Sequence, residues 1–166
     1  KAYLAGKLSK VIVAESRPLL EGLNFANRLL DFGIPVTIVV DAGLGFFSKN
    51  ATFALVGADT VQSDGSLVHK IGTYPLALAC YDLGKSFYVV CDTLKFSKTA
   101  TINQPVKIEQ KSPTEIVNKN KLCNAEIKNI YFDNTPAKLV TEIITEEKKF
   151  KPNRKNLDKK NKSGCY

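Results

Sequence analysis

An acid or a base follows each of four short apolar segments in the first hundred residues. The segments are residues 11–14, 36–40, 53–56 and 87–90, and the charged residues after them are Glu15 and Arg17, Asp41, Asp59, and Asp92 and Lys95. In a parallel sheet these side chains gather at the edge where such sheets bind ligands. Carboxylates placed there exchange protons with hydroxyl or carbonyl groups, and cations there bind phosphate. Chance placement of loop charges explains one or two of the four.

The segment Lys70-Ile71-Gly72-Thr73 is the candidate anion site, because it opens a helical pattern. Backbone N–H groups at a helix N-terminus and an adjacent lysine together favour a phosphate. We expect Arg17 and Lys95 to reach the same ligand from neighbouring strand ends, and Asp59 to exchange protons with a sugar hydroxyl or carbonyl. The alternatives are that Thr73 only caps the helix and that Asp59 is a structural turn residue.

The elements that must position these residues follow from the hydrophobic pattern. The four apolar segments are continuous rather than alternating, which is typical of strands that helices cover on both faces. Apolar residues at helical spacing occupy residues 19–32 and 73–83, and Gly33 and Gly84 follow as stops. Strands that alternate with helices at short spacing predict right-handed βαβ units. The predicted fold is therefore α/β, an open, doubly wound, mostly parallel sheet in a Rossmann-like three-layer domain.

The pattern weakens after Phe96, and the later elements are predicted from shorter signals. Residues 101–120 are polar and contain two prolines, which indicates a surface loop, and residues 125–130 are expected to form a late strand. Thr135-Pro136 resembles the first positions of a closing helix that runs to about residue 144. Residues 1–8 have helix-forming composition, and we expect them to be the end of a helix that begins upstream.

The composition excludes several classes of protein. With 166 residues, 44% of them hydrophobic and 24% charged, the chain fits one globular domain without a membrane-spanning run, and its first residues lack the apolar core of a secretory signal. It has no glycine-rich dinucleotide motif and no phosphate-loop motif. His69 is the only histidine and the four cysteines form no close pair, so neither a metal nor a cofactor is expected. Cys80 and Cys91 lie in apolar surroundings, which predicts buried free thiols and a cytoplasmic location.

The net charge of +8 is concentrated at the C-terminus. Residues 147–166 hold eight Lys or Arg residues and two acids, so the remaining 146 residues carry a net charge of only +2. This predicts a basic polar tail at residues 148–166 after one domain at residues 1–147. The alternative is a tail that binds RNA or an acidic partner through its charge, although a tail without interleaved aromatic residues is weak evidence for specific RNA recognition. The sequence has no methionine, even at position 1, which predicts that it begins inside a longer polypeptide or has been processed.

Five longer segments together carry a family resemblance. They are VIVAESRPLLEG, PVTIVVDAGLG, LVGADTVQSDGSLVHKIGTYPLALAC, FYVVCDTLKF and NIYFDNTPAKLVTEIITE. In this order and spacing they resemble the alpha, beta and delta regulatory subunits of translation initiation factor 2B and the related isomerases of ribose 1,5-bisphosphate and methylthioribose 1-phosphate. The resemblance covers residues 1–147 and is to the C-terminal, Rossmann-like half of such proteins, without their helical N-terminal domain.

The resemblance implies roles for five residues. Asp59 falls on the acid/base residue of the isomerases, and Lys95 matches a lysine that contacts substrate. His69 and Lys70 stand where the family has an Asn-Lys pair that binds substrate. Arg17 belongs to a Ser-Arg-Pro signature expected at the phosphate end. The catalytic cysteine of the isomerases belongs to a segment upstream of residue 1 and matches no cysteine of this sequence.

Two departures from the family pattern decide between the functional hypotheses. His69 replaces the usual Asn, and Glu21 replaces a Gln, where a carboxylate would repel a phosphate. Both departures favour a regulatory subunit that assembles with itself, with sister subunits or with a translation initiation factor, and that binds a phosphorylated sugar or nucleotide. The candidate acid/base and substrate lysines favour an aldose–ketose isomerase instead, and a third hypothesis is an oligomerisation platform alone. Phe46 and Phe47 follow a glycine-rich turn, which predicts a dimer interface there, unless both pack into the domain's own core.

Overall fold

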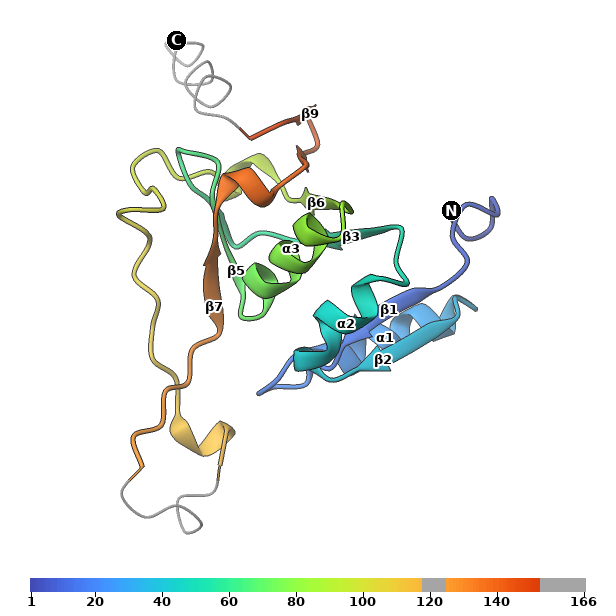
Figure 1. The fold of residues 1–166 in the computed structure, drawn as a ribbon, viewed down its shortest axis with the longest axis horizontal. Helices are drawn as coiled ribbons and strands as arrows, with labels where there is room; N and C mark the ends of the chain where they lie inside the picture. Colours follow the sequence, from blue (N-terminus) through green and yellow to red (C-terminus); the bar gives the residue numbers. More distant parts are fainter. Residues whose placement is uncertain (118–124, 153–166) are drawn as a thin grey trace.

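The computed structural model describes residues 1–117 and 125–152, which form nine strands and three α-helices (Figure 1). The strands are β1 (Val11–Ala14), β2 (Val36–Val39), β3 (Phe53–Val56), β4 (Thr60–Val61), β5 (Leu67–Lys70), β6 (Ser86–Val90), β7 (Phe132–Thr135), β8 (Glu142–Ile144) and β9 (Lys149–Phe150). The helices are α1 (Glu21–Asp31), α2 (Leu44–Ser48) and α3 (Thr73–Asp82). Cys123, Cys165 and the tail from residue 153 onward lie outside the described residues.

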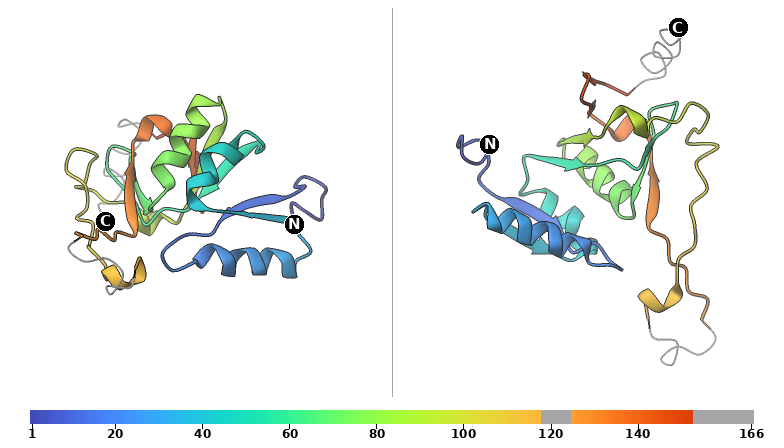
Figure 2. Two further views of the ribbon diagram at one scale, coloured as in Figure 1. Left: turned by 60° about the horizontal axis from the view of Figure 1, so that its bottom comes forward. Right: turned by 180° about the vertical axis from the view of Figure 1, so that it is seen from behind.

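Parallel strands joined through helices build the fold. β1 pairs with β2 in parallel, and β3, β6 and β8 form a second parallel set to which β9 adds an antiparallel edge. α1 runs along the β1–β2 pair, and α3 packs against β3, β6 and β7 (Figure 2). This architecture confirms the predicted α/β fold class. The described strands nevertheless fall into three sheets, β1-β2, β3-β6-β8-β9 and the antiparallel β4-β5-β7, so β1 and β3 each end a sheet.

Glycines end the two predicted helices, α1 and α3, where the sequence indicates. Gly33 has a φ of 71° and donates its N–H to the Leu30 carbonyl at 2.8 Å, and Gly84 has a φ of 63° and donates to the Tyr81 carbonyl at 3.2 Å. Only glycine adopts this left-handed conformation without strain. Residues 1–6 form a single turn that Gly6 ends in the same way, in place of the longer helical segment expected over residues 1–8.

The core lies where α3 covers the second parallel set. Phe87, Val89 and Ile143 on β6 and β8 are completely buried, and Ala77 and Cys80 of α3 pack against them. Burial of this apolar area stabilises the half of the domain that carries the helix start at residues 70–73. Cys91 is only half-buried, so the prediction of a buried thiol is right for Cys80 and wrong for Cys91.

Two predicted C-terminal elements are wrong. Residues 125–130 form no strand and contribute only a single bridge between Ile130 and Gln110. Thr135-Pro136 does not start a helix, because Thr135 is the buried last residue of β7, and one 3-10 turn at Ala137–Leu139 leads directly into β8. The β-branched residues of the segment 140–145 favour this strand over a helix.

Two surface features also differ from expectation. The strands are not covered on both faces throughout, since Phe53 and Leu55 of β3 are 46% and 58% exposed. The ordered chain continues past residue 147, because β9 pairs with β8 and the Phe150 ring lies 6.0 Å from that of Phe96. Among residues 1–117 and 125–152, no helix has the length and apolar character needed to cross a bilayer.

Candidate functional site

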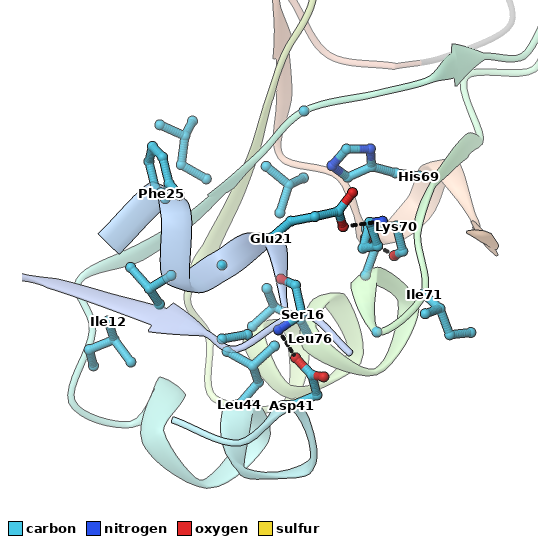
Figure 3. Close-up of a pocket in the computed structure, with 18 of the residues that line it drawn as sticks. Ile12, Ser16, Glu21, Phe25, Asp41, Leu44, His69, Lys70, Ile71 and Leu76 are labelled. Atoms are coloured by element: carbon cyan, nitrogen blue, oxygen red, sulfur yellow. Dashed lines mark hydrogen bonds and ion pairs between the residues drawn. The ribbon is translucent and has the colours of Figure 1, made fainter. Parts of the chain in front are cut away.

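A pocket of about 620 Å³ opens between β1 and β3 and reaches the first turn of α3 (Figure 3). All four residues of β1 line one wall, and Leu55, Val56 and Gly57 line the opposite wall. The polar and charged side chains at the pocket come from other elements; they are Ser16, Glu21, Asp41, His69, Lys70 and Thr73. The pocket therefore runs along the facing edges of β1 and β3 and reaches some of the residues that follow them.

Lys70 is held in the pocket wall by an ion pair with Glu21, the first residue of α1. The Lys70 Nζ contacts a Glu21 carboxylate oxygen, with the two side chains 25% and 50% exposed. Lys70 also lies over the Tyr131 ring, with its Nζ 5.1 Å from the ring centroid. Figure 3 shows the two charged groups meeting at the wall beside His69. The candidate phosphate-binding lysine thus already has an anionic partner from its own chain.

Asp59 and His69 form a second polar pair next to Lys70. The Asp59 Oδ2 lies 2.8 Å from the His69 Nδ1. The pairing of β4 with β5 brings these residues together, because the Asp59 N–H donates to the Val68 carbonyl at 3.0 Å. His69 lines the pocket, and Asp59 stands behind it outside the lining residues. The structure therefore joins three of the predicted site residues in one cluster.

The start of α3 is occupied by a carboxylate that the sequence analysis missed. The Asp133 carboxylate of β7 accepts the Gly72 N–H at 2.8 Å and the Tyr74 N–H at 3.1 Å. Burial raises the pKa of Asp133 above its ordinary value, although these N–H groups act in the opposite direction. Thr73 donates its hydroxyl to the Lys70 carbonyl at 2.6 Å. The helix start that was expected to bind phosphate is thus capped by the chain itself.

The remaining predicted cations lie away from this cluster. The Arg17 Nη2 donates to the carbonyls of Glu115 and Ile116 at 3.4 Å, and Arg17 does not line the pocket. Lys95 is exposed at the end of the 3-10 turn Thr93–Lys95 and is not a lining residue either. Their roles in binding stay predictions, since a ligand is needed to test them.

Two further acids near the site accept hydrogen bonds from the protein itself, one from backbone N–H groups and one from a tyrosine hydroxyl. Asp41 accepts the N–H groups of Ser16 and Arg17 at 2.8 and 2.7 Å, which fixes the loop after β1. The Glu115 carboxylate accepts the Tyr131 hydroxyl at 2.7 Å, and this hydrogen bond raises the pKa of Tyr131 to about 12. In the described ranges no group of three or more potential metal ligands could hold an ion.

A family comparison identifies the fold that builds this pocket. The family model described as the Initiation factor 2 subunit family matches residues 1–152. The chain belongs to this family. It is 44% identical over 141 residues to an eIF-2B subunit 2-like protein of Pyrococcus furiosus, and 39% identical over 146 residues to a ribose 1,5-bisphosphate isomerase of Methanocaldococcus jannaschii. These matches cover 85% and 87% of the chain and 48% and 47% of the relatives.

Solved structures of family members agree with the fold. The crystal structure of Pyrococcus horikoshii translation initiation factor eIF-2B matches with a TM-score of 0.80 and 38% identity, over 93% of this chain and 53% of that one. The 5-methylthioribose 1-phosphate isomerase of the same organism matches with a TM-score of 0.87 and 28% identity, over 95% and 46%. The chain therefore spans about half the length of the relatives it matches, and the predicted family resemblance is confirmed.

Proposed function

We propose that the chain is part of a regulatory subunit similar to those of translation initiation factor 2B, and that its pocket binds a phosphorylated sugar or nucleotide at Lys70. The observation that carries this proposal is the position of Lys70 in the pocket wall, next to the Asp59–His69 pair and the first turn of α3. The contact between Glu21 and Lys70 favours weak, reversible binding, because the Glu21 carboxylate competes with a phosphate for the Lys70 ammonium.

A sugar-phosphate isomerase is the second candidate. The Asp59–His69 pair supports it, since a carboxylate and an imidazole beside a pocket are suited to moving protons at a sugar carbon and its carbonyl. A relative that is 39% identical is named ribose 1,5-bisphosphate isomerase. Its reaction class is aldose–ketose isomerisation.

Ribose 1,5-bisphosphate is the probe for both candidates, and only formation of a product distinguishes them, because the catalytic cysteine of the isomerases matches no cysteine of this sequence. We expect the backbone amides of residues 70–73 to shift in NMR titrations, with no isomer formed on prolonged incubation. Lys70→Ala should abolish the shifts, whereas Lys111→Ala should keep them. Lys111 is the matched control because it also pairs with a glutamate and lies over the Tyr131 ring, but it does not line the pocket. Shifts that persist in Lys70→Ala contradict the site, and formation of a ketose product establishes the isomerase instead.

Assembly and location complete the proposal. Phe46 is 63% exposed beside the glycine-rich turn, which supports an interface with a second copy, a sister subunit or an initiation factor. The Lys49 Nζ lies 3.8 Å from the centroid of the Phe46 ring, whereas the neighbouring Phe47 is half-buried. Sedimentation of Phe46→Ser beside the unchanged chain tests this, since only the variant should remain a monomer at micromolar concentration. The free thiols of Cys80 and Cys91 support a cytoplasmic location.

A further inference from the structure

We propose that Asp59 fixes His69 in the Nδ1–H tautomer, so that the His69 Nε2 accepts a hydrogen bond from a sugar hydroxyl in the pocket. The inference rests on the proposed function and assigns the part of the ligand that Lys70 does not bind. His69 becomes a specificity-determining residue for a hydroxyl donor, and Asp59 becomes its positioning residue.

The tautomer follows from the contact between the two side chains. An ionised carboxylate only accepts hydrogen bonds, and the Asp59 Oδ2 lies 2.8 Å from the His69 Nδ1. The Nδ1 of a neutral imidazole must therefore carry the proton, which leaves the Nε2 as an acceptor. Both residues are held in place by the hairpin of β4 and β5, in which the Asp59 N–H bonds to the Val68 carbonyl.

The Nε2 is available to a ligand. Within residues 1–117 and 125–152, no protein group forms a hydrogen bond with it, and His69 lines the pocket. Figure 3 shows the imidazole extending from β5 above the Glu21–Lys70 pair. Gly57 leaves room for this ring, because a Cβ at residue 57 would lie 3.2 Å from the His69 Cε1 and 3.4 Å from the Nε2.

The charges around His69 favour a hydroxyl donor over a second phosphate. Asp59 faces it from the loop after β3, Asp133 stands opposite it on β7, and the Glu21 carboxylate of α1 meets the neighbouring Lys70. Lys70, the neighbouring cation, is engaged by Glu21. Acceptors therefore dominate this end of the pocket, and acceptors of this kind hold the hydroxyl groups of a ribose in other α/β sheets.

The single histidine of the sequence makes the tautomer directly measurable. Nitrogen-15 NMR of the side chain should show a protonated Nδ1 and an unprotonated Nε2 at pH 7.5. Asp59→Asn should give a mixture of tautomers, because an amide can donate as well as accept. Asp92→Asn is the matched control, since Asp92 also follows a parallel strand but serves the Leu94 N–H outside the pocket.

Ligand selectivity tests the second half of the proposal. The chain should bind ribose 5-phosphate about three- to tenfold more tightly than inorganic phosphate, which is the contribution of one good hydrogen bond. Asp59→Asn and His69→Phe should remove this preference, which is read as the ratio of the two affinities because loss of the Asp59 charge also changes the binding of inorganic phosphate. Protonation of His69 should remove it too, because the imidazolium Nε2 can only donate.

Each possible result decides the proposal. A protonated Nε2 in the unchanged chain overturns it, and so does a preference for ribose 5-phosphate that survives in both variants. If neither phosphate compound binds, the proposed function fails, and the tautomer measurement together with a titration by ribose itself still tests His69. Chemical-shift changes at the Nε2 with ribose then support the hydroxyl subsite, and their absence overturns it.

Discussion

Replacement of Glu21 by glutamine should convert the pocket into a better phosphate site. Glu21 contacts Lys70 and is the anionic group that an incoming phosphate meets there. Glutamine keeps the size and hydrogen-bonding capacity of the side chain but removes the charge. We therefore expect Glu21→Gln to bind inorganic phosphate more tightly than the unchanged chain does. The Lys70 ammonium, released from the Glu21 carboxylate, is then available to the phosphate.

The magnitude follows from the exposure of the two side chains. A unit charge about 4 Å from another interacts with about 4 kcal/mol at an effective dielectric constant near 20. Glu21 is half exposed and Lys70 a quarter exposed, so solvent and salt screen much of this energy. A net gain of about 0.5–1 kcal/mol remains, which corresponds to a phosphate affinity about two- to fivefold higher.

Phosphate titration followed at the amides of residues 70–73 measures the effect. Glu109→Gln is the matched control, because Glu109 pairs with Lys111 at 2.6 Å but lies outside the pocket. The gain should shrink as salt rises, since screening weakens a through-space repulsion. Equal affinities for the unchanged chain and Glu21→Gln would refute the argument that Glu21 repels the ligand.

Three further predictions concern stability and reactivity. Gly22→Ala should destabilise the fold by about 2–4 kcal/mol in urea unfolding, because its Cβ would lie 1.8 Å from the Ala14 carbonyl oxygen, whereas Gly45→Ala, with 3.6 Å of clearance, should cost nothing. Burial and two neighbouring carboxylates raise the pKa of Cys91 to about 11, so its alkylation rate at pH 8, read by peptide mass spectrometry, should be about a hundredfold below that of an ordinary thiol and still rise at pH 10. Burial opposes ionisation of Asp64, yet hydrogen bonds from Ile102 and Ser66 lower its pKa, so Asp64→Asn should lose stability at pH 7, and its difference from the unchanged chain should disappear as the pH falls through this lowered pKa.

Four strands and two helices of the first ninety residues could be predicted because their signals are local, whereas α2 and the short strands β4 and β5 were not predicted. The runs of Val and Ile gave four strands, and Gly33 and Gly84 marked the ends of α1 and α3. The C-terminal part could not be predicted in this way, because its strands pair with partners that are far away in the sequence. Thr135 resembles a helix cap locally, but its place is set by pairing with Leu67 of β5. Pairing with a distant strand overrides a local capping preference.

The candidate site was predictable in part for the same reason. Lys70 and Asp59 follow from the positions of strand ends and a helix start. The partners of these groups do not, because Glu21 reaches Lys70 from another element and Asp133 reaches the α3 amides only through the register of β7 against β5. Position along the chain indicates which residues come near a site, and packing decides which of their charges remain available to a ligand.

Among the described residues no strand pairs with the outer edge of β1 or of β3, and this bears on how the chain behaves in concentrated solution. The N–H groups of Val11 and Glu15 donate to the carbonyls of Pro35 and Val39, so the N–H of Ile12 between them points away from β2, toward the pocket. Backbone donors and acceptors of this kind at a sheet edge are a template on which another polypeptide can add a strand. On β3 they are accompanied by the exposed side chains of Phe53 and Leu55. We therefore expect the isolated chain to aggregate by edge-to-edge pairing, and a charged substitution such as Leu55→Lys to keep it in solution.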